Sequence, residues 1–298
     1  MADNRTKECS MKTPERIQPL VEEGLVDEVI CQLMSGKEAM IYVVRCGEGI
    51  RCAKVYKEIN RRSFHHSADY TEGRREKNSR RARAISKATP YGRKARHDEW
   101  QGVEVDTLYR LAAAGVTVPQ PYSLFEGVLL MELITAKHGT IAPRLNDMIL
   151  TAEQSRDYFH GLARQVVRML CAGVIHGDLS EYNVLAGSKG LVIIDLPQAI
   201  VAARNNGARS MLIRDMDNLA AYFGRFAPDL LGMDYGREIW SLYQNGRLHA
   251  DTDLTGYTEH NRRPADVAGV LRAVDTVLKK ETAWQRYKHE TRRHARPR

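Results

Sequence analysis

Four polar residues in the middle of the chain have the types and the spacing needed for phosphoryl transfer. His176, Asp178 and Asn183 form the pattern H-x-D-x-x-x-x-N, and Asp195 lies twelve residues beyond Asn183, after the apolar run 191–194. This arrangement of a loop and a strand-borne aspartate is used for phosphoryl transfer from ATP. The pattern therefore predicts an ATP-dependent phosphotransferase.

The chemistry of the reaction explains why these residue types are needed. The Asp178 carboxylate would orient the accepting hydroxyl group and take its proton. The Asn183 amide oxygen and the Asp195 carboxylate are hard donors that suit Mg²⁺. His176 would orient the backbone of the loop. A lone aspartate is more often a helix cap or a solvated loop residue, but the complete string favours the catalytic interpretation.

The first third of the chain offers a lysine for the phosphates. Lys54 lies inside the apolar run 52–56, and a buried ammonium group requires an anionic partner. Glu104, on the helix that follows, is the natural partner, and Glu99 is its competitor. The alternative is a lysine on an edge strand with its amine in solvent.

A loop ahead of Lys54 occupies the position of a phosphate-binding loop. Ser35, Gly36, Lys37 and Glu38 could present backbone N–H groups and a hydroxyl to the phosphates. With one glycine the loop is not a G-x-G-x-x-G motif, and alone it could be a plain turn. A strand follows it instead of a helix, which excludes a Walker A motif.

The run 129–134 lies where a connector between two lobes would bind the adenine base. The backbone of Glu132 and Ile134 could pair with the adenine edge, with Met131 at the back of the pocket. Leu185, in the short apolar strand after Asn183, completes this set of nucleotide-binding candidates. An ordinary buried strand is compatible with that role.

The elements around these residues suggest an α+β protein. Residues 17–33 have helical spacing, and two strand-like runs joined by a Gly turn predict an antiparallel hairpin at 40–44 and 50–56. A strand is expected at 128–134 and another at 190–194. Helices are expected at 98–114, 151–172, 217–226, 235–244 and 264–287, with a capping box formed by Thr151 and Gln154.

Composition limits the class of protein. The chain has 298 residues, 43% of them hydrophobic, which is enough for a sizeable core and excludes wholesale disorder. No apolar run approaches the roughly 20 residues of a membrane helix. The polar segment 1–16 excludes an ordinary secretory signal. The five scattered cysteines favour a reducing compartment. We therefore expect a soluble, cytoplasmic protein without a membrane partner.

The net charge of +8 is concentrated in two segments. Residues 57–97 contain 13 Lys and Arg against 4 Asp and Glu, and residues 279–298 contain 8 against 2. Such segments attract polyanions, for example RNA or ribosomes. The alternative is a solvated loop and tail that maintain solubility, since nothing in the sequence resembles an RNA-recognition module.

Five motifs together resemble those of the RIO family of atypical serine/threonine protein kinases, in the branch without an N-terminal winged helix. They are Ser-Gly-Lys-Glu-Ala-x-x-Tyr at 35–42, Ala-Lys-Val-Tyr-Lys at 53–57, Pro-Arg-Leu-x-Asp at 143–147, His-Gly-Asp-Leu-Ser-Glu-Tyr-Asn at 176–183 and Ile-Asp-x-x-Gln at 194–198. The resemblance covers about residues 20–240. It implies a two-lobed, protein-kinase-like α+β fold. The expected parts are a polar segment (1–19), a β-rich N-lobe (20–134) with a flexible basic loop (57–97), a mainly helical C-lobe (135–278) and a basic tail (279–298).

The resemblance also implies an activity. RIO proteins bind ATP and Mg²⁺, for which Mn²⁺ can substitute, and phosphorylate Ser and Thr, often on themselves. Family members are further known for a phospho-aspartate on the metal-binding aspartate, here Asp195, and for ATPase-driven roles on ribosomal precursors. Ser79, Ser86 and Thr89 in the basic loop are candidate autophosphorylation sites.

Departures from ordinary protein kinases leave alternatives open. Gly177 replaces the usual Arg of the catalytic loop, Asp195-Leu-Pro197 replaces Asp-Phe-Gly, and no activation segment is recognisable. A small-molecule phosphotransferase of the aminoglycoside or choline kinase type also uses His-Gly-Asp with a downstream Asn, although the Gly-Lys-Glu-Ala loop argues against it. A third interpretation is an ATPase switch in ribosome assembly. The sequence does not identify the protein substrate.

Overall fold

The computed structural model describes residues 11–36, 39–57 and 90–257, and the side chains of the last segment from residue 102 onward. The chain divides into two units, Met1–Gly256 and Tyr257–Arg298, and nearly all described residues belong to the first. None of the described helices is long and apolar enough to cross a bilayer. The described cysteines are free thiols: Cys31, Cys46, Cys52 and Cys171.

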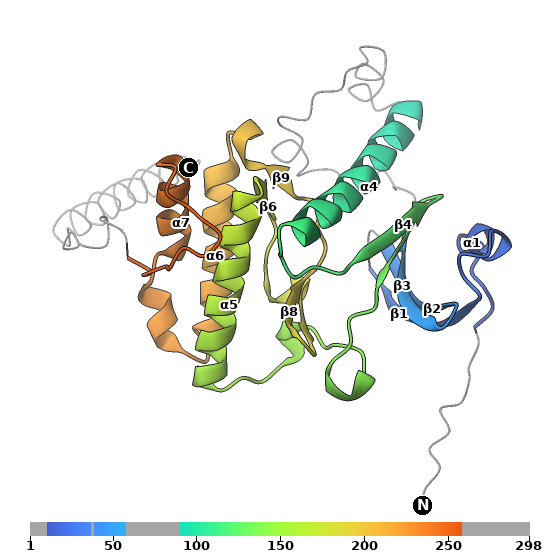
Figure 1. Ribbon diagram of the computed structural model, residues 1–298, viewed down its shortest axis with the longest axis horizontal. Coiled ribbons are helices and arrows are strands. Elements are labelled where there is room, and N and C mark those ends of the chain that lie inside the picture. The colour runs from blue at the N-terminus through green and yellow to red at the C-terminus, as the bar shows by residue number, and fades with distance from the viewer. Residues whose placement is uncertain (1–10, 37–38, 58–89, 258–298) are drawn as a thin grey trace, which may run out of the picture. The chain divides into compact units, whose positions relative to one another are not determined.

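A five-stranded antiparallel sheet forms the first part of the described chain (Figure 1). Its strands are β1 (Glu28–Ser35), β2 (Ala39–Cys46), β3 (Gly49–Tyr56), β4 (Pro121–Phe125) and β5 (Val128–Glu132), in the order β1-β2-β3-β5-β4. The hairpin of β2 and β3 confirms the predicted pair of strands and their Gly turn. β3 therefore lies at the centre of the sheet, where both of its backbone edges pair with a neighbouring strand.

The helix predicted at 17–33 is wrong for most of its length. Helix α1 covers only Gln18–Glu22, and β1 begins at Glu28. The chain leaves the helix at Gly24, which has a φ of +70°. Beyond this glycine, Val26 and Val29 are buried in a small apolar core that also contains Leu20. Pairing with β2 along the strand outweighs the local helical spacing.

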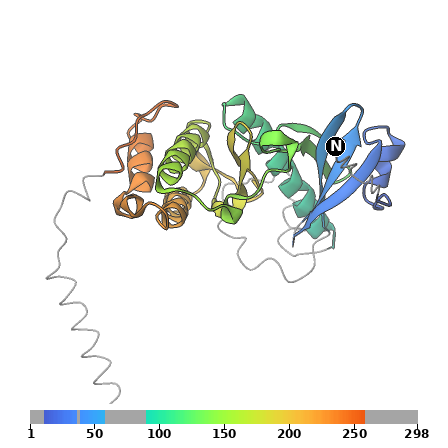
Figure 2. The same cartoon turned by 90° about the horizontal axis from the view of Figure 1, so that it is seen from below.

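Helix α4 (Pro90–Ala113) lies between β3 and β4 in the chain, and both of these strands belong to the five-stranded sheet. It ends as predicted before Gly115, whose φ is +74°, but begins eight residues earlier than the spacing suggested. Figures 1 and 2 show α4 between the sheet and the C-terminal helices. Its residues Leu108 and Leu111 are buried in the same core as residues of α5.

The second part of the fold is mainly helical, with α5 (Ala152–Cys171), α6 (Ala208–Phe223) and α7 (Tyr235–Gln244). The capping box of α5 is confirmed: Thr151 Oγ1 accepts from the Gln154 N–H, and the Gln154 side chain accepts from the Thr151 N–H. The range of α7 matches the prediction, and α6 begins nine residues before the predicted helix. The helix predicted at 264–287 lies outside the described residues.

Short strands and 3₁₀ turns connect the longer elements of this part of the chain. They are the strands β6 (Val174–Ile175), β7 (Val184–Gly187), β8 (Gly190–Ile193) and β9 (Ile200–Val201), and the 3₁₀ turns η1 (Lys137–Gly139), η2 (Leu145–Asp147), η3 (Glu181–Asn183), η4 (Ala202–Arg204) and η5 (Pro228–Gly232). β7 and β8 pair as an antiparallel hairpin, and β6 pairs with β9. A contact of His176, which follows β6, with the Ile194 carbonyl oxygen, which follows β8, brings the ends of these strands together.

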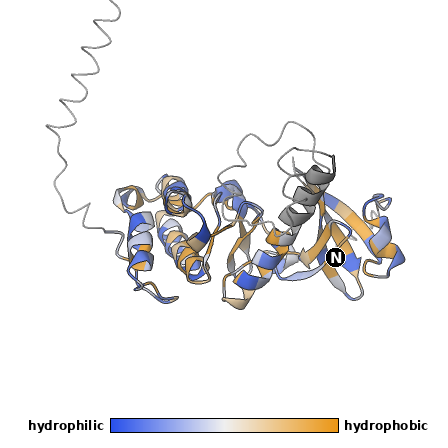
Figure 3. Cartoon of the chain, turned by 90° about the horizontal axis from the view of Figure 1, so that it is seen from above, coloured by the Kyte–Doolittle hydropathy of each residue, from blue (hydrophilic) through white to orange (hydrophobic). Residues whose placement is uncertain are grey.

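Apolar residues gather on the strands and on the facing sides of the helices (Figure 3). The main core joins α4, α5, α6 and the short strands, and fully buried members include Phe159, Leu170 and Phe223. Each such side chain contributes about 1.5–3 kcal/mol on burial. This arrangement of a β-rich part and a helical part is the predicted two-lobed, protein-kinase-like α+β fold.

Candidate active site

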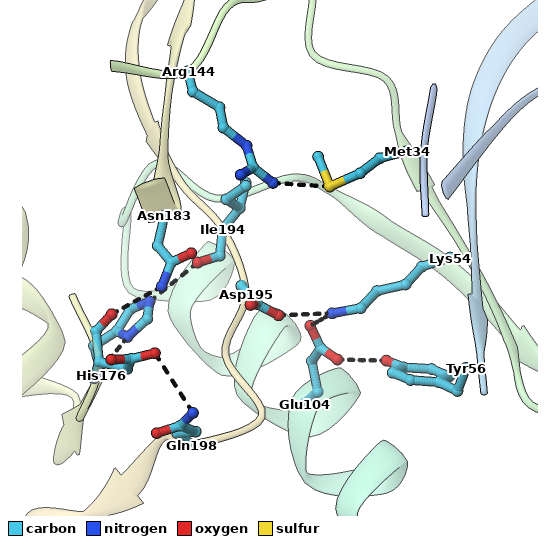
Figure 4. A network of polar contacts seen from close by, with 11 residues as sticks. Met34, Lys54, Tyr56, Glu104, Arg144, His176, Asn183, Ile194, Asp195 and Gln198 are labelled. Carbon is cyan, nitrogen blue, oxygen red and sulfur yellow. Dashed lines mark hydrogen bonds and ion pairs between the residues drawn. The ribbon is translucent and has the colours of Figure 1, made fainter. Parts of the chain in front are cut away.

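Lys54 forms ion pairs with two carboxylates at once (Figure 4). Its Nζ lies 2.7 Å from Glu104 Oε1 and 3.0 Å from Asp195 Oδ1. The lysine is 7% exposed. Burial alone lowers the pKa of an ammonium group, but the charges of Glu104 and Asp195 outweigh burial and raise the Lys54 pKa above its ordinary value. The pairs join β3, α4 and the segment after β8 at one point.

Glu104 is held by a second side chain that the sequence interpretation did not include. The Tyr56 hydroxyl donates to Glu104 Oε2 at 2.5 Å. Burial, followed by the Glu104 charge, raises the pKa of the Tyr56 phenol, so that it stays protonated and remains a donor. A signal was present, because residues 54 and 56 of a strand point to the same face. The side chain of Glu99, the competing partner, lies outside the described residues.

The loop of residues 176–183 is ordered by contacts of its own residues. The Asp178 N–H donates to His176 Nδ1 at 3.3 Å, so the ring proton belongs on Nε2, which lies 3.1 Å from the Ile194 carbonyl oxygen. The Asn183 Nδ2 donates to the Asp178 carbonyl at 2.8 Å. His176 and Asn183 thus fix the backbone on both sides of Asp178, and the Asn183 amide oxygen remains for another partner.

Asp215, in α6, accepts hydrogen bonds from the backbone of the same loop. The sequence interpretation did not include this residue. Its two oxygens accept from the Gly177 N–H at 2.8 Å and the Leu179 N–H at 3.0 Å, and Arg214 donates to the Gly177 carbonyl. Burial raises the pKa of Asp215 to about 6. No spacing signal connects residue 215 with a loop almost forty residues earlier, so only the fold reveals this contact.

Gly177 has a conformation that explains why it replaces a larger residue. Its φ is +82°, in the region that favours glycine. The peptide groups on both sides of Gly177 can therefore point toward Asp215 and Arg214. At this position both backbone groups of Gly177 are held by hydrogen bonds, and no arginine side chain is present.

Asp178 has the properties of a proton acceptor. Burial, with a smaller contribution from the Asp195 charge, raises its pKa above the ordinary value. A more basic carboxylate takes a proton from a hydroxyl group more readily. The Gln198 Nε2 lies 3.5 Å from Asp178 Oδ2 and approaches the carboxylate from the segment after β8 (Figure 4).

Asp195 is an ionised carboxylate in a strained backbone position. Its φ is +66°, which is uncommon for a residue other than glycine and is often found at functional sites. Burial would raise its pKa, but the charge and hydrogen bond of Lys54 outweigh burial and lower it. The Asp195 side chain remains 44% exposed, and only Oδ1 contacts Lys54.

The donors around Asp195 suit Mg²⁺. The Ile194 N–H donates to the Asn183 carbonyl at 3.0 Å across the β7–β8 hairpin, which brings Asn183 next to Asp195. One amide oxygen and one carboxylate are hard donors, and Mg²⁺ commonly takes its remaining ligands from phosphates and water. In the part of the chain that the structure describes, no group of three or more His, Cys, Asp or Glu side chains is arranged to hold a metal ion.

The loop between β1 and β2 is closed by a lysine. Lys57 Nζ lies 3.0 Å from Ser35 Oγ and 2.6 Å from the Gly36 carbonyl oxygen. The Gly36 N–H donates to the Ala39 carbonyl at 2.9 Å, so this N–H already serves the turn. Lys37 and Glu38 lie outside the described residues. The structure thus adds Lys57 to the residues of this loop.

The connector after β5 has one backbone donor free. The Glu132 N–H donates to the Gln120 carbonyl at 2.8 Å, and the Ile134 carbonyl accepts from the Ala142 N–H at 3.0 Å. Within the described ranges, no acceptor lies within hydrogen-bond distance of the Ile134 N–H. Of the two backbone positions proposed for the adenine edge, Ile134 therefore keeps a donor.

An apolar cluster adjoins this connector. Ile134 and Leu185 belong to it, together with Ala142, Val192 and Ile194. Met131 is half-buried against the main core. Two nucleotide-binding candidates from distant parts of the sequence, Ile134 and Leu185, therefore share one apolar cluster beside the connector, whereas Met131 packs against a different core.

Arg144 spans from the segment after the connector to β1. Its Nη2 lies 3.0 Å from Met34 Sδ (Figure 4), and its backbone forms a bridge with Leu185. Its charge also contributes to the lowered pKa of Asp195. Since Met34 is the residue before Ser35, Arg144 lies beside the expected path of a bound nucleotide.

The fold and these contacts together define a protein-kinase-like phosphotransferase. Comparison with solved structures supports the fold: the Rio2 kinase of Chaetomium thermophilum, described as an ADP/Mg²⁺-phosphoaspartate complex, matches with a TM-score of 0.54 at 19% identity. The match covers 90% of this chain and 81% of that chain.

Sequence comparison defines the family. The RIO domain matches residues 40–235. The RIO-type serine/threonine-protein kinase Rio1 of Haloferax volcanii is 33% identical over 224 residues, covering 72% of this chain and 70% of that protein. The serine/threonine-protein kinase RIO1 of Chaetomium thermophilum is 29% identical over 291 residues, covering 92% of this chain and 51% of its own length. The chain belongs to the RIO family of serine/threonine protein kinases.

This membership confirms the family resemblance and favours a protein kinase over a small-molecule phosphotransferase. The relatives differ in length. The chain spans about half of the fungal protein and 35% of human RIO1, to which it is 28% identical over 208 residues.

Proposed function

We propose that this chain is an ATP- and Mg²⁺-dependent RIO-type kinase that transfers the γ-phosphoryl group of ATP to Ser and Thr hydroxyl groups of proteins, including its own. The observation that carries the proposal is the pairing of Lys54 with both Glu104 and Asp195. This contact joins the predicted phosphate-binding lysine to the predicted metal ligand, from residues 141 positions apart in the chain.

In the proposed reaction the hydroxyl oxygen of the acceptor attacks the γ-phosphorus, and the bond to the β–γ bridging oxygen breaks to release ADP. Asp178 accepts the hydroxyl proton, which its raised pKa favours. Lys54 binds the α- and β-phosphates, and Glu104 keeps it in place. Asn183 and Asp195 would hold Mg²⁺, which neutralises phosphate charge when bound.

The remaining candidates would bind the nucleotide. Ser35, Gly36 and Lys37 would lie over the phosphates, and the Ile134 N–H and the Glu132 backbone would meet the adenine edge. Met131 and Leu185 would enclose the base together with Ile134. This division agrees with the apolar character of the connector side and the charged character of the Lys54 side.

Incubation with γ-labelled ATP and Mg²⁺ tests the proposal. Phosphate on Ser or Thr is stable to acid and to hydroxylamine, and it should be absent in Asp178→Ala. Each of Lys54→Ala and Asp195→Ala should also abolish label while circular dichroism shows a folded chain. A fully active Asp195→Ala would contradict the metal assignment.

A second candidate function is an ATPase switch that passes through a phosphate on Asp195. Two observations support it: the exposed Asp195 carboxylate, and the phosphoaspartate in the described complex of the Chaetomium Rio2 kinase. Here a carboxylate oxygen attacks the γ-phosphorus, ADP leaves, and water later hydrolyses the acyl phosphate. Label released by hydroxylamine, with continuous phosphate release, would favour this function.

The partners of either function are proposed from charge. The basic segments 57–97 and 279–298 would bind RNA or a ribosomal precursor.

We also expect Mn²⁺ to support turnover in place of Mg²⁺, because hard oxygen donors accept both ions. The cytoplasmic location expected from the cysteine pattern is tested by fractionation of cells that express the tagged chain.

A further inference from the structure

Tyr56 forms a three-residue contact with Glu104 and Lys54. The Tyr56 hydroxyl donates a hydrogen bond to Glu104 Oε2 at 2.5 Å, and Lys54 Nζ donates one to Glu104 Oε1 at 2.7 Å. Both donors come from one strand, β3, and the acceptor comes from α4. The Glu104 carboxylate is therefore held at both oxygens by the same element (Figure 4).

This contact is shielded from water. Tyr56 is 1% exposed and Glu104 is 3% exposed, so water has little access to either group. The Lys54 Nζ also lies 5.3 Å from the centre of the Tyr56 ring, within the range of a cation–π contact. A buried carboxylate that lost one donor would keep an unpaired oxygen, which is costly where water cannot replace it.

We propose that Tyr56 is a positioning residue, whose hydroxyl fixes Glu104 and α4 on β3 and thereby keeps Lys54 aligned with the phosphates of ATP. The inference rests on the proposed function, which it deepens. Without the Tyr56 donor, Glu104 can rotate about its side-chain bonds, and Lys54 is drawn toward its other partner, Asp195. Lys54 would then compete for the carboxylate that is expected to bind the metal.

The Tyr56→Phe variant tests this directly, because it removes the hydroxyl and keeps the buried ring. We expect kcat to fall about tenfold and the KM for ATP to change less than about threefold, since misalignment weakens the transition state more than ground-state binding. The matched control is Tyr42→Phe, in β2. Tyr42 is also buried, and its hydroxyl contacts Met40 Sδ at 3.4 Å instead of the site. An unchanged kcat in Tyr56→Phe, or an equal loss in Tyr42→Phe, would overturn the proposal.

A double-mutant cycle separates positioning from packing. In a Glu104→Gln background with measurable activity, the additional effect of Tyr56→Phe should shrink below about twofold, because the carboxylate that Tyr56 positions is gone. A further tenfold loss in that background would mean that Tyr56 acts through something other than Glu104.

Amide hydrogen exchange of the full-length chain provides a readout that needs no activity. Tyr56→Phe should increase exchange in α4 around residue 104, and Tyr42→Phe should not. If the wild-type chain transfers no phosphate, the proposed function fails, and exchange in α4 still decides whether Tyr56 holds the helix. Unchanged exchange in Tyr56→Phe would overturn the inference even if the kinase proposal stands.

Discussion

At the scale of single residues, the site is organised by the balance of charge around Lys54. One ammonium group faces two carboxylates, of which Glu104 is buried and Asp195 is partly exposed. The buried partner is satisfied at both oxygens, whereas Asp195 has an oxygen available for another ligand. The asymmetry favours a structural role for Glu104 and a chemical role for Asp195.

Replacing Lys54 should affect stability and turnover separately. Lys54→Met leaves Glu104 buried with one donor, which should lower the free energy of unfolding by about 2–4 kcal/mol. The double variant Lys54→Met/Glu104→Gln should recover much of that stability but none of the activity. Denaturant unfolding and label transfer measure the two effects. As a control, Arg45→Met breaks the exposed pair with Glu28 and should cost less than about 1 kcal/mol.

Asp215 should make stability depend on pH in a specific direction. Its folded pKa of about 6 lies above the ordinary 3.8, so the folded chain binds more protons than the unfolded chain between these values. The free energy of unfolding should therefore gain an Asp215 contribution that decreases as pH rises from about 4 to 6, by at most about 3 kcal/mol. Denaturant unfolding across this range should show that component in the wild type and lose it in Asp215→Asn. Identical pH slopes in the two proteins would contradict the assignment.

At the scale of elements, short strands and turns position the reactive side chains. Asp178 and Asn183 lie between β6 and β7, and Asp195 follows β8, so two small strand pairs set their separation. The loop between β6 and η3 has its backbone held by α6 through Asp215. The helical part thereby adds a support from outside to a loop whose own residues, His176 and Asn183, also contact its backbone.

A methyl group at Gly177 tests how tightly this loop is held. Gly177→Ala forces an alanine to a φ of +82°, which should cost about 1–2 kcal/mol and reduce kcat by displacing Asp178. Gly161→Ala is the matched control, since it lies inside α5 and an added Cβ would meet no atom within 4 Å. That change should instead stabilise the chain by about 0.5–1 kcal/mol. Equal effects of the two substitutions on activity would show that the loop tolerates displacement.

The elements that the sequence predicts well are those with strong local signals. The capping box and apolar face define α5, and the Gly turn with its β-branched runs defines the β2–β3 hairpin. β1 was mistaken for helix because its bulged pairing with β2 disrupts the alternation of a strand. The start of α6 was placed too late because its N-cap residue, Gly207, has no side chain that could give a capping signal.

The candidate site shows the same limit. Residues in contiguous motifs, such as Asp178 and Asn183, can be found from their spacing. Tyr56, Asp215 and Lys57 act through partners that the fold brings close, with separations of 21–48 residues. Spacing along the chain does not encode such contacts, because they depend on how β3 and α6 pack against other elements.

At the scale of the whole molecule, the charge distribution predicts a salt-sensitive partner. If the tail 279–298 contacts RNA phosphates, deleting it should weaken binding to a generic RNA and make the plot of log K against log salt shallower. Fluorescence anisotropy at several salt concentrations measures both slopes. Binding that does not change with salt, or the absence of binding, would contradict a role in RNA contact.

The position of Lys57 has a consequence for the kinetics of self-modification. Lys57 contacts Ser35 and Gly36 beside the expected phosphates. Residues 58–89, a stretch of 32, separate Lys57 from the start of α4 at Pro90. A stretch of this length has a contour of roughly 110 Å, so its midpoint can extend about half that distance from its anchors. The expected radius of gyration of a 250-residue domain is only about 18 Å.

Among the candidate acceptors, Ser79 is separated from Pro90 by the longest stretch of chain, up to roughly 37 Å, so we expect it to reach the site of its own molecule at an effective concentration set by the tether and not by the solution. Autophosphorylation at Ser79 should be first order, with a rate constant unchanged over about a hundredfold dilution of the protein. A rate constant that falls in proportion to protein concentration would instead mean that one molecule phosphorylates another. Such a kinase would phosphorylate itself after it binds ATP, whether or not a substrate protein is present.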